Sequence, residues 1–109
     1  MPIESPALLA GVPELMVLRL LKAQEMYGYE IVQAISVKTG GVVTPGEGVV
    51  YPLLHALEKD GALKSRRKTV NGRSRVYYTL TARGAKRLAA LTGDWTALNI
   101  AVQQVLHAV

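Results

Sequence analysis

Positively charged side chains gather in one segment of the chain, which indicates what this sequence binds. Ten of the 13 Lys and Arg residues lie between Lys59 and Arg87, where Asp60 is the single acidic residue. Six of these cations and no acid fall between Lys64 and Arg75. A local positive field of this kind attracts polyanions, with nucleic acid as the first candidate and an anionic membrane as the second. The alternative is a solvated face that only keeps the protein in solution, although such faces usually mix both signs of charge.

Residue sets typical of enzymes are missing from the sequence. His55 and His107 lie 52 positions apart on different expected helices, which disfavours a shared metal site. Gly40-Gly41 lacks the strand-to-helix context and the following lysine of a phosphate-binding loop. Asp60 and Asp94 are the only aspartates, and neither stands beside a nucleophile and a base. We therefore predict a protein that is not an enzyme and has neither a cofactor nor a metal site.

The composition is that of one small domain. The chain has 109 residues, of which 50% are hydrophobic, and it contains no cysteine for a disulfide or a thiolate metal site. Glu4 and Glu14 stand where a signal peptide carries basic residues, and Arg19 interrupts the apolar run that a membrane-spanning helix needs. We expect a soluble cytoplasmic protein with no membrane partner.

Two helices are expected in the first part of the chain. Leu8–Lys22 carries apolar residues at helical spacing, and Pro13 places the start of its regular part at about Val12. A second helix is expected over Tyr29–Ile35, and a pair of glycines ends it. Val42-Val43 is long enough only for a short strand.

A third helix is expected to end at Gly61, and its start has two alternatives. In the first, Thr44 is the N-cap of a capping box with Glu47 at its third position. In the second, Gly46 is the N-cap and the helix begins at Glu47. Both registers give the helix an apolar face, made of Val50, Leu53, Leu54 and Leu57. The outward face then carries Glu47, Gly48, Tyr51 and His55.

Pro52 lies inside this third helix in either register. Proline has no backbone N–H and typically costs about 3 kcal/mol in a helix interior. The carbonyl group that loses its partner belongs to Gly48, and glycine adapts most easily to the proline ring. We therefore expect Pro52 to set the angle at which the tip of this helix is presented to a partner.

Residues 62–80 are expected to form a β-hairpin. Asn71-Gly72 is a strong type I′ turn signal, and a two-residue loop is the simplest register, with a longer mobile tip as the alternative. Residue alternation in the second strand predicts one buried face, with Val76, Tyr78 and Leu80, and one open face, with Arg75, Tyr77 and Thr79. In the tight register Arg67 lies on the Val76 side. The opposite face carries Lys64, Arg66, Lys68, Arg75 and Tyr77.

Thr81 is expected to cap a last helix that runs nearly to the C-terminus. Its apolar residues repeat at alternating spacings of 3 and 4, namely Leu88, Leu91, Trp95, Leu98, Val102, Val105 and Val109. A helix of about 27 residues is roughly 40 Å long, more than so small a domain can cover. We expect a second copy of the chain to cover this heptad seam, and packing wholly on its own domain is the alternative.

This order of elements is that of a winged helix-turn-helix, in which the basic hairpin is the wing. We expect a mostly α-helical (α+β) fold, with a DNA-binding domain at 1–80 and a dimerisation helix at 81–109, compact as a whole. The third helix fits a major groove about 12 Å wide, while the cationic hairpin reaches phosphates beside it.

Three motifs resemble the PadR family of transcriptional regulators: "YGYEIVQAI", "VYPLLHALEKDGAL" and "GRSRVYYTLTARG", followed by a tryptophan in the last helix. They stand in the family's order and spacing and span nearly the whole chain. The resemblance implies a dimeric winged-helix repressor of the compact subfamily, whose terminal helices build the dimer. It also implies that a flat aromatic or drug-like effector stacks on Trp95 between subunits. Glu47-Gly48-Val49 departs from the family, which often has a proline, a glycine and a small hydroxyl residue there.

The candidate site residues fall into three sets. The DNA-binding set is Tyr27, Thr44, Gly48, Tyr51, His55, Lys64, Arg66, Lys68, Arg73 and Arg75. The effector-binding set, supported by the resemblance alone, is Leu8, Leu15, Leu91, Trp95 and Asn99. The dimerisation set is Leu88, Leu91, Trp95, Leu98, Val102 and Val105.

Several of these residues also have a simpler structural role open to them. The Tyr51 hydroxyl reaches DNA, or its ring packs against the wing. His55 reaches a phosphate or has no measurable role, and Trp95 binds an effector or only fills the dimer core. We predict a DNA-binding transcriptional regulator, a homodimeric repressor of a double-stranded operator, relieved by a small aromatic or hydrophobic effector. The alternatives are a winged-helix protein-interaction module without DNA binding and a small-molecule-binding protein without a regulatory role.

Overall fold

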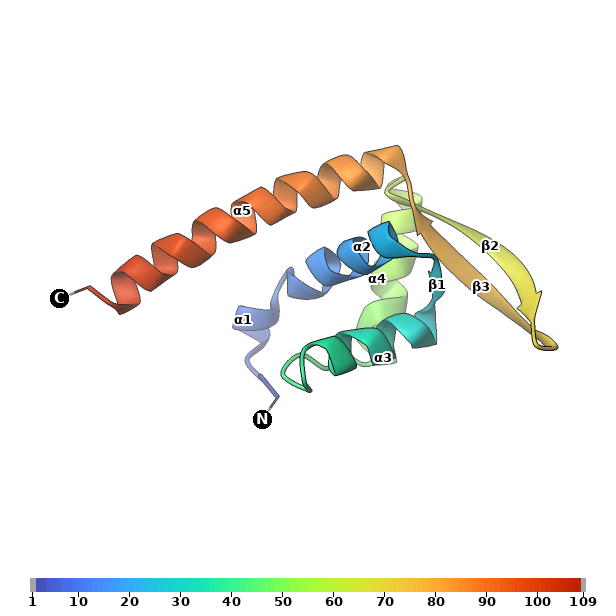
Figure 1. The fold of residues 1–109 in the computed structure, drawn as a ribbon, viewed down its shortest axis with the longest axis horizontal. Helices are drawn as coiled ribbons and strands as arrows, with labels where there is room; N and C mark the ends of the chain where they lie inside the picture. The colour runs from blue at the N-terminus through green and yellow to red at the C-terminus, as the bar shows by residue number, and fades with distance from the viewer. Residues whose placement is uncertain (1, 109) are drawn as a thin grey trace.

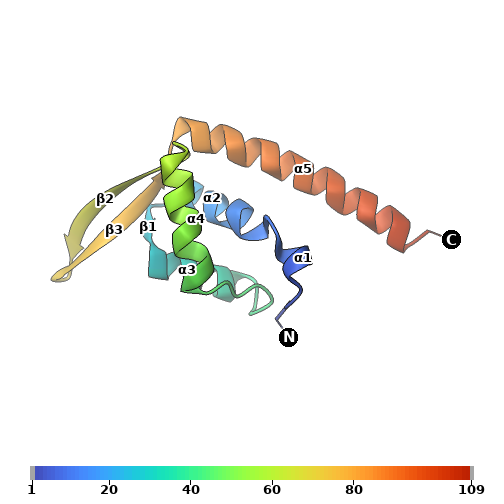
Figure 2. The ribbon, with the colours of Figure 1, turned by 180° about the vertical axis from the view of Figure 1, so that it is seen from behind.

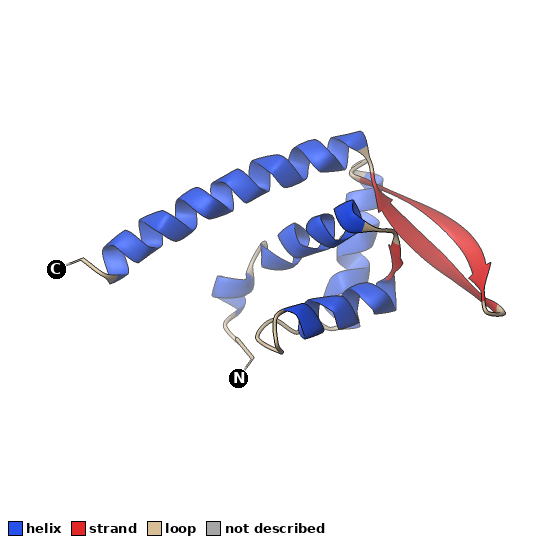
Figure 3. Ribbon diagram, viewed as in Figure 1, coloured by secondary structure: helices blue, strands red, loops and turns tan. Residues whose placement is uncertain are grey.

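The computed structural model describes residues 2–108, so Val109, the last position of the heptad pattern, lies outside the described residues. The elements are α1 (Pro6–Leu9), α2 (Val12–Ala23), β1 (Met26–Tyr27), α3 (Gly28–Lys38), α4 (Glu47–Lys59), β2 (Leu63–Val70), β3 (Arg73–Leu80) and α5 (Ala82–Leu106). Helices α2, α3 and α4 form a group from which the hairpin and α5 project in different directions (Figures 1 and 3). The predicted mostly α-helical winged helix-turn-helix with a small β-sheet is therefore confirmed.

The hydrophobic core lies where α2, α3 and α4 meet the base of the hairpin. Its fully buried side chains include Leu18 of α2, Ile31 and Ile35 of α3, Leu54 of α4 and Leu63 of β2. The spacing of four between the two isoleucines places both on one side of α3. Seen from behind, α4 crosses in front of α2 and α3 (Figure 2), so its apolar face is the one that closes this core.

Helix α4 follows the second of the two registers that the sequence allowed. Gly46 is its N-cap, with extended backbone (φ −82°, ψ 177°) and a carbonyl that accepts a hydrogen bond from the N–H of Val50 at 3.1 Å. Thr44 lies in the exposed loop before it. Gly61 follows the helix with a φ of +87°, a left-handed conformation that glycine adopts at low cost. Pro52 lies inside the helix, as expected.

The hairpin has the tight turn that the sequence predicted. Asn71 and Gly72 both have positive φ, 53° and 78°, as a type I′ turn requires, and Val70 pairs directly with Arg73. Strand β3 also pairs with β1, which gives a three-stranded antiparallel sheet in the order β1-β3-β2. The sheet therefore joins the hairpin to the segment that enters α3.

The expected short strand at Val42-Val43 is wrong, because the third strand of the sheet is β1. Local hydrogen bonds occupy this segment: the N–H of Val42 donates to the carbonyl of Thr39 at 3.1 Å, and the N–H of Val43 donates to Thr39 Oγ1 at 3.0 Å. The Val42 carbonyl accepts from the N–H of Ile3. These bonds leave the segment as a turn that closes α3.

The expectation of an open hairpin face at Tyr77 is also wrong. Tyr77 is almost as buried as Tyr78 on the other face. The pairing of β1 with β3 brings Tyr27 beside it, with ring centres 5.4 Å apart in an edge-to-face arrangement. The Nζ of Lys68 lies 4.3 Å from the centre of the Tyr77 ring. Contacts from distant segments thus cover a residue that local alternation placed in solvent.

Helix α5 is continuous, and only its first part is covered by the rest of the chain. Leu88 is buried and Leu91 is half-buried, whereas Trp95 and the later seam residues are exposed. The exposed seam consists of Trp95, Leu98, Val102 and Val105. Figures 1 and 2 show this part of α5 running toward the C-terminus away from α4. The alternative in which α5 packs wholly on its own domain is therefore wrong.

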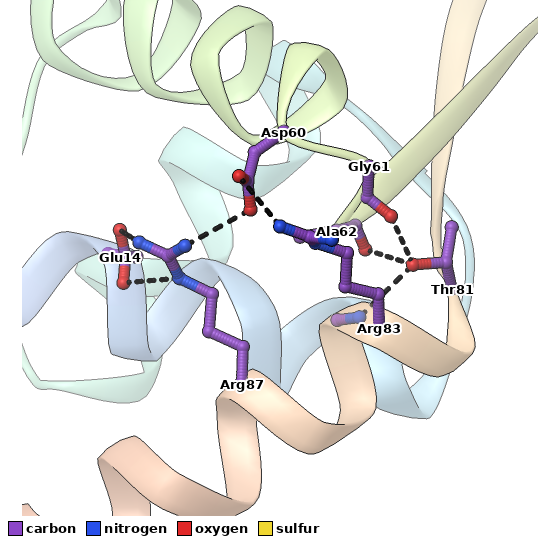
Figure 4. Close-up of polar contacts among 8 residues, drawn as sticks. Glu14, Asp60, Gly61, Ala62, Thr81, Arg83 and Arg87 are labelled. Carbon is purple, nitrogen blue, oxygen red and sulfur yellow. Dashed lines mark hydrogen bonds and ion pairs between the residues drawn. The ribbon is translucent and has the colours of Figure 1, made fainter.

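The first turns of α5 are tied to the end of α4 and to α2 by polar contacts (Figure 4). Arg87 forms ion pairs with Glu14 of α2 at 2.9 Å and with Asp60 at 3.2 Å, and Arg83 also reaches Asp60 at 3.3 Å. The hydroxyl of Thr81, the N-cap residue, accepts a hydrogen bond from the N–H of the third residue of α5. These contacts fix α5 relative to α4.

Candidate nucleic-acid interface

A groove of about 630 Å³ lies between the start of α3, the outer side of α4 and the hairpin. Its lining is aromatic, polar and basic, and none of the described residues that line it is acidic. The lining consists of Tyr27, Gly28, Tyr29, Tyr51, His55, Arg67, Arg73, Ser74, Arg75, Val76 and Tyr78. Positive charge beside aromatic and hydroxyl groups is the chemistry that binds a nucleic-acid backbone and stacks on or donates to its bases.

Tyr51 lies in this groove against the first residue of α3. A Cβ atom on Gly28 would lie 2.6 Å from Cζ and 2.8 Å from the hydroxyl of Tyr51, so the close approach requires glycine. The start of α3 is held by Glu30, whose carboxylate accepts a hydrogen bond from the N–H of Tyr27 at 3.1 Å. The ring therefore packs on α3, whereas the sequence had left open a hydroxyl that reaches DNA or a ring that packs against the wing. His55 follows one turn later on the same side and is exposed.

The hairpin carries cations on both of its faces. Arg67 is opposite Val76 in the register and lines the groove, where its Nη1 donates to Ser74 Oγ at 3.3 Å. Arg75 belongs to the other face, yet it also reaches the groove, since its guanidinium lies 4.2 Å above the ring of Tyr27. The groove thus receives cations from two sides of the hairpin.

Two hairpin cations bind a carboxylate that lies far away in the sequence. Glu25, in the link between α2 and β1, forms an ion pair with Arg66 at 3.2 Å and another with Lys68. The hydrogen bond from Lys68, and next that from Arg66, hold the pKa of the Glu25 carboxyl below its ordinary value of 4.5. The carboxylate therefore offsets part of the positive charge of the hairpin.

Tyr78 is nearly fully buried, and its side chain lines the groove. Burial raises the pKa of its phenol, and the negative charge of Glu58 raises it further. Since the ordinary pKa of a tyrosine is 10.0, this shift leaves the hydroxyl group protonated at neutral pH. Glu58 accepts a hydrogen bond from Ser65 Oγ, which ties the last turn of α4 to β2.

The structure separates the ten candidate DNA-binding residues into groups. Those that line the groove are Tyr27, Tyr51, His55, Arg73 and Arg75. Arg66 and Lys68 lie with Glu25, Lys64 is exposed on the same hairpin face, and Thr44 and Gly48 are exposed before and at the start of α4. Their roles in binding stay predictions.

Six further groove residues were not among the candidates that the sequence gave, namely Gly28, Tyr29, Arg67, Ser74, Val76 and Tyr78. The tight hairpin register had placed Arg67 on the Val76 face, but local alternation read that face as the buried one. In the structure this same face borders the groove. The sequence therefore predicted the hairpin face on which Arg67 lies, but not the direction of that face relative to α4.

The candidate effector residues do not meet in one cavity within the described chain. A cavity of about 380 Å³ between α2, α3 and α5 includes Leu15 but not Leu8, Leu91, Trp95 or Asn99. Leu8 is 72% exposed and Trp95 is 47% exposed. The cavity is lined by Leu15, Met16, Arg19, Leu20, Ile35, Lys38, Thr39 and Thr92.

Among residues 2–108 no cluster of three or more metal-ligating side chains occurs. No helix in the described part of the chain has both the length and the apolar character that crossing a membrane requires.

Known proteins are similar to this chain in sequence and in fold. The model of the "Transcriptional regulator PadR-like family" matches residues 17–90. The transcriptional regulator Rv3488 of Mycobacterium tuberculosis is 42% identical over 82 residues, which cover 75% of this chain and 71% of that protein. A transcriptional regulator from Clostridium thermocellum has a TM-score of 0.86 at 27% identity, over 94% of this chain and 97% of that one.

A PadR family transcriptional regulator from Eggerthella lenta has a TM-score of 0.83 at 26% identity, over 94% of this chain and 88% of that one. The agreement thus includes the order and the arrangement of the elements, not only the three sequence motifs. The protein belongs to the PadR-like family of transcriptional regulators and has the DNA-binding winged-helix fold.

Proposed function

We propose that the protein is a homodimeric repressor that binds a double-stranded operator in the cytoplasm. The observation that carries DNA binding is the groove between α3, α4 and the hairpin, with its basic and aromatic lining. Helix α4 enters the major groove with Tyr51 and His55 toward the DNA, and the hairpin cations contact phosphates beside it. Residues 1–80 act as the DNA-binding unit and residues 81–109 as the dimerisation helix.

The exposed seam of α5 supports the dimer. Trp95 and Leu98 are 47% and 56% exposed, and they lie one turn apart on the same stripe. Burying apolar surface contributes roughly 25 cal/mol per Å², so a second α5 seam would stabilise both chains. A two-fold axis through this contact presents two α4 helices to half-sites about 34 Å apart.

A small aromatic or hydrophobic effector at the dimer interface would relieve repression. Trp95, with Leu8, Leu15, Leu91 and Asn99, is the proposed site. The 47% exposure of Trp95 supports this site, and the cavity beside Leu15 borders α5 at Thr92. The effector must prefer one arrangement of the two subunits, since equal affinity for both arrangements leaves their equilibrium unchanged.

Binding of random-sequence duplex DNA over a series of NaCl concentrations tests the DNA-binding role. The logarithm of the association constant should fall linearly with the logarithm of the salt concentration, by about 0.9 for each phosphate neutralised. Arg67→Gln should lower that slope by about 0.9 if Arg67 contacts a phosphate. Lys38→Gln removes the same charge from the far end of α3 and should leave the slope unchanged. A wild-type protein that binds no DNA at low salt would support the protein-interaction module.

The fluorescence of Trp95, the single tryptophan, tests the effector. Flat aromatic compounds that quench it should release DNA over the same range of concentration. Quenching without release would indicate a ligand-binding protein without a regulatory role.

A further inference from the structure

Glu25 holds two hairpin cations in a geometry that resembles a phosphate contact. Arg66 donates to both carboxylate oxygens, from Nη2 at 3.2 and 3.4 Å and from Nε at 3.4 Å. The Nζ of Lys68 donates to the same carboxylate. Forked binding of a guanidinium to two oxygens of one anion is how arginine also binds a DNA phosphate.

The position of Glu25 is set by the sheet and not by its own flexibility. The next residue, Met26, pairs with Tyr78 in β3, so the backbone at Glu25 is held beside the hairpin. The Glu25 side chain is 24% exposed, and that of Lys68 is 32% exposed because it lies over Tyr77. Partial burial makes this ion pair less open to solvent screening than a pair on the open surface.

The hairpin therefore does not offer all six of its cations to DNA in the free protein. Arg66 and Lys68 already have an anionic partner, whereas Arg67, Arg73 and Arg75 line the groove. A phosphate that binds Arg66 and Lys68 must displace the Glu25 carboxylate. The gain in binding free energy is therefore only the difference between the two contacts. Arg66 and Lys68 therefore add little to the affinity for DNA that α4 does not hold close to the hairpin.

We propose that Glu25 is a positioning residue for DNA binding, which withholds Arg66 and Lys68 from the phosphates of non-operator DNA. This inference rests on the proposed function, because it assumes that the hairpin contacts DNA. Glu25 thereby lowers the affinity for random duplex DNA and raises the ratio of operator binding to non-specific binding.

The test compares the full-length wild type with Glu25→Gln, which keeps the size of the side chain and removes its charge. Affinity for a random-sequence duplex is measured by fluorescence anisotropy over a series of NaCl concentrations. Glu25→Gln should bind more tightly, with a salt slope steeper by up to about 1.8, since two more cations become available at about 0.9 each. Glu4→Gln, the same change in an exposed residue of the N-terminal segment, should leave both quantities unchanged.

Two further variants make the test specific to the ion pairs. Glu25→Ala should give the same steeper slope, so the result does not depend on how one variant folds. In a protein that already carries Arg66→Gln and Lys68→Gln, Glu25→Gln should have no further effect on affinity or slope. An effect that persists in that background would show a general charge effect and overturn the proposal.

The outcomes separate this inference from the proposed function. If the wild type binds no duplex at low salt, the proposed DNA-binding function fails and the role of Glu25 fails with it. If the wild type binds and Glu25→Gln binds equally or more weakly, only the role of Glu25 is overturned.

Discussion

The ring of Tyr51 in α4 lies directly against the Cα of Gly28, the first residue of α3. The tip of the Tyr51 side chain reaches across from α4, and a Cβ atom on Gly28 would stand 2.6 Å from its Cζ. Carbon atoms in contact normally lie about 3.5–4.0 Å apart, so the site has no room for a methyl group. This contact holds the end of the Tyr51 side chain in the groove against the start of α3.

Gly28→Ala should destabilise the protein by about 1–3 kcal/mol, because the methyl group must displace the ring or separate the helices. The measurement is the free energy of unfolding in urea. Gly48→Ala is the matched control, since nothing lies within 4 Å of a Cβ there and alanine favours a helix by about 0.5–1 kcal/mol. Equal stability of Gly28→Ala and the wild type would contradict the packing described.

Pro52→Ala should raise the free energy of unfolding by about 1–3 kcal/mol, because it restores the N–H that bonds to the carbonyl of Gly48. Since Pro52 is interior to α4, we also expect a change in affinity for DNA, from the altered angle of the helix tip. Urea unfolding and DNA binding are measured on the same preparation. Higher stability with unchanged affinity would mean that the proline does not set this angle.

Arg87→Gln should lower the free energy of unfolding by up to about 1 kcal/mol at low ionic strength, and by less at high salt. The effect is small because the Arg87 side chain is 41% exposed, although it bridges Glu14 and Asp60. A double-mutant cycle with Asp60→Asn isolates the coupling. Lys86→Gln, a neighbouring exposed cation, serves as the control, and an equal loss there would show that the ion pairs of Arg87 contribute nothing.

Glu25 should make stability depend on pH in acid. Its pKa is lowered in the folded protein by Lys68 and Arg66, so its ionised form stabilises the fold above the ordinary value of 4.5. This contribution is lost as the pH falls through the lowered folded pKa. Glu25→Gln should therefore have a lower melting temperature than the wild type at neutral pH, and this difference should disappear in acid. Thermal unfolding followed by circular dichroism over a pH series measures this difference. A difference that stays constant with pH would contradict the stabilising role of the ionised Glu25 carboxylate.

Leu98→Glu should convert the proposed dimer into a folded monomer. The residue is 56% exposed in one chain and lies on the proposed seam, where a buried charge costs several kcal/mol. The dimer dissociation constant should rise about a hundredfold or more, since each 1.4 kcal/mol is a factor of ten. Analytical ultracentrifugation gives the mass. Ala97→Glu, about 100° around α5 from Leu98 and outside the seam, should leave the mass unchanged. A wild type that is monomeric at micromolar concentration would refute the dimer.

The sequence by itself determined the order of the helices, the tight hairpin turn, the cap at Thr81 and the place of Pro52. Each depends on the periodicity, capping or turn chemistry of residues only a few positions apart, so local patterns contain the information. The family resemblance came from the same local motifs. The start of α4 stayed open between Thr44 and Gly46, because both residue types cap helices.

Only the tertiary structure decided which groups meet across the chain. It put the third strand at β1, buried Tyr77 beneath Tyr27 and turned Arg67 toward the groove. Glu25 lies 41 and 43 positions from Arg66 and Lys68, and no local pattern records such a separation. Ion pairs and ring contacts of this kind depend on the packing of the whole chain. The sequence therefore identified the hairpin cations, while the fold decided which of them pair with Glu25 and which line the groove.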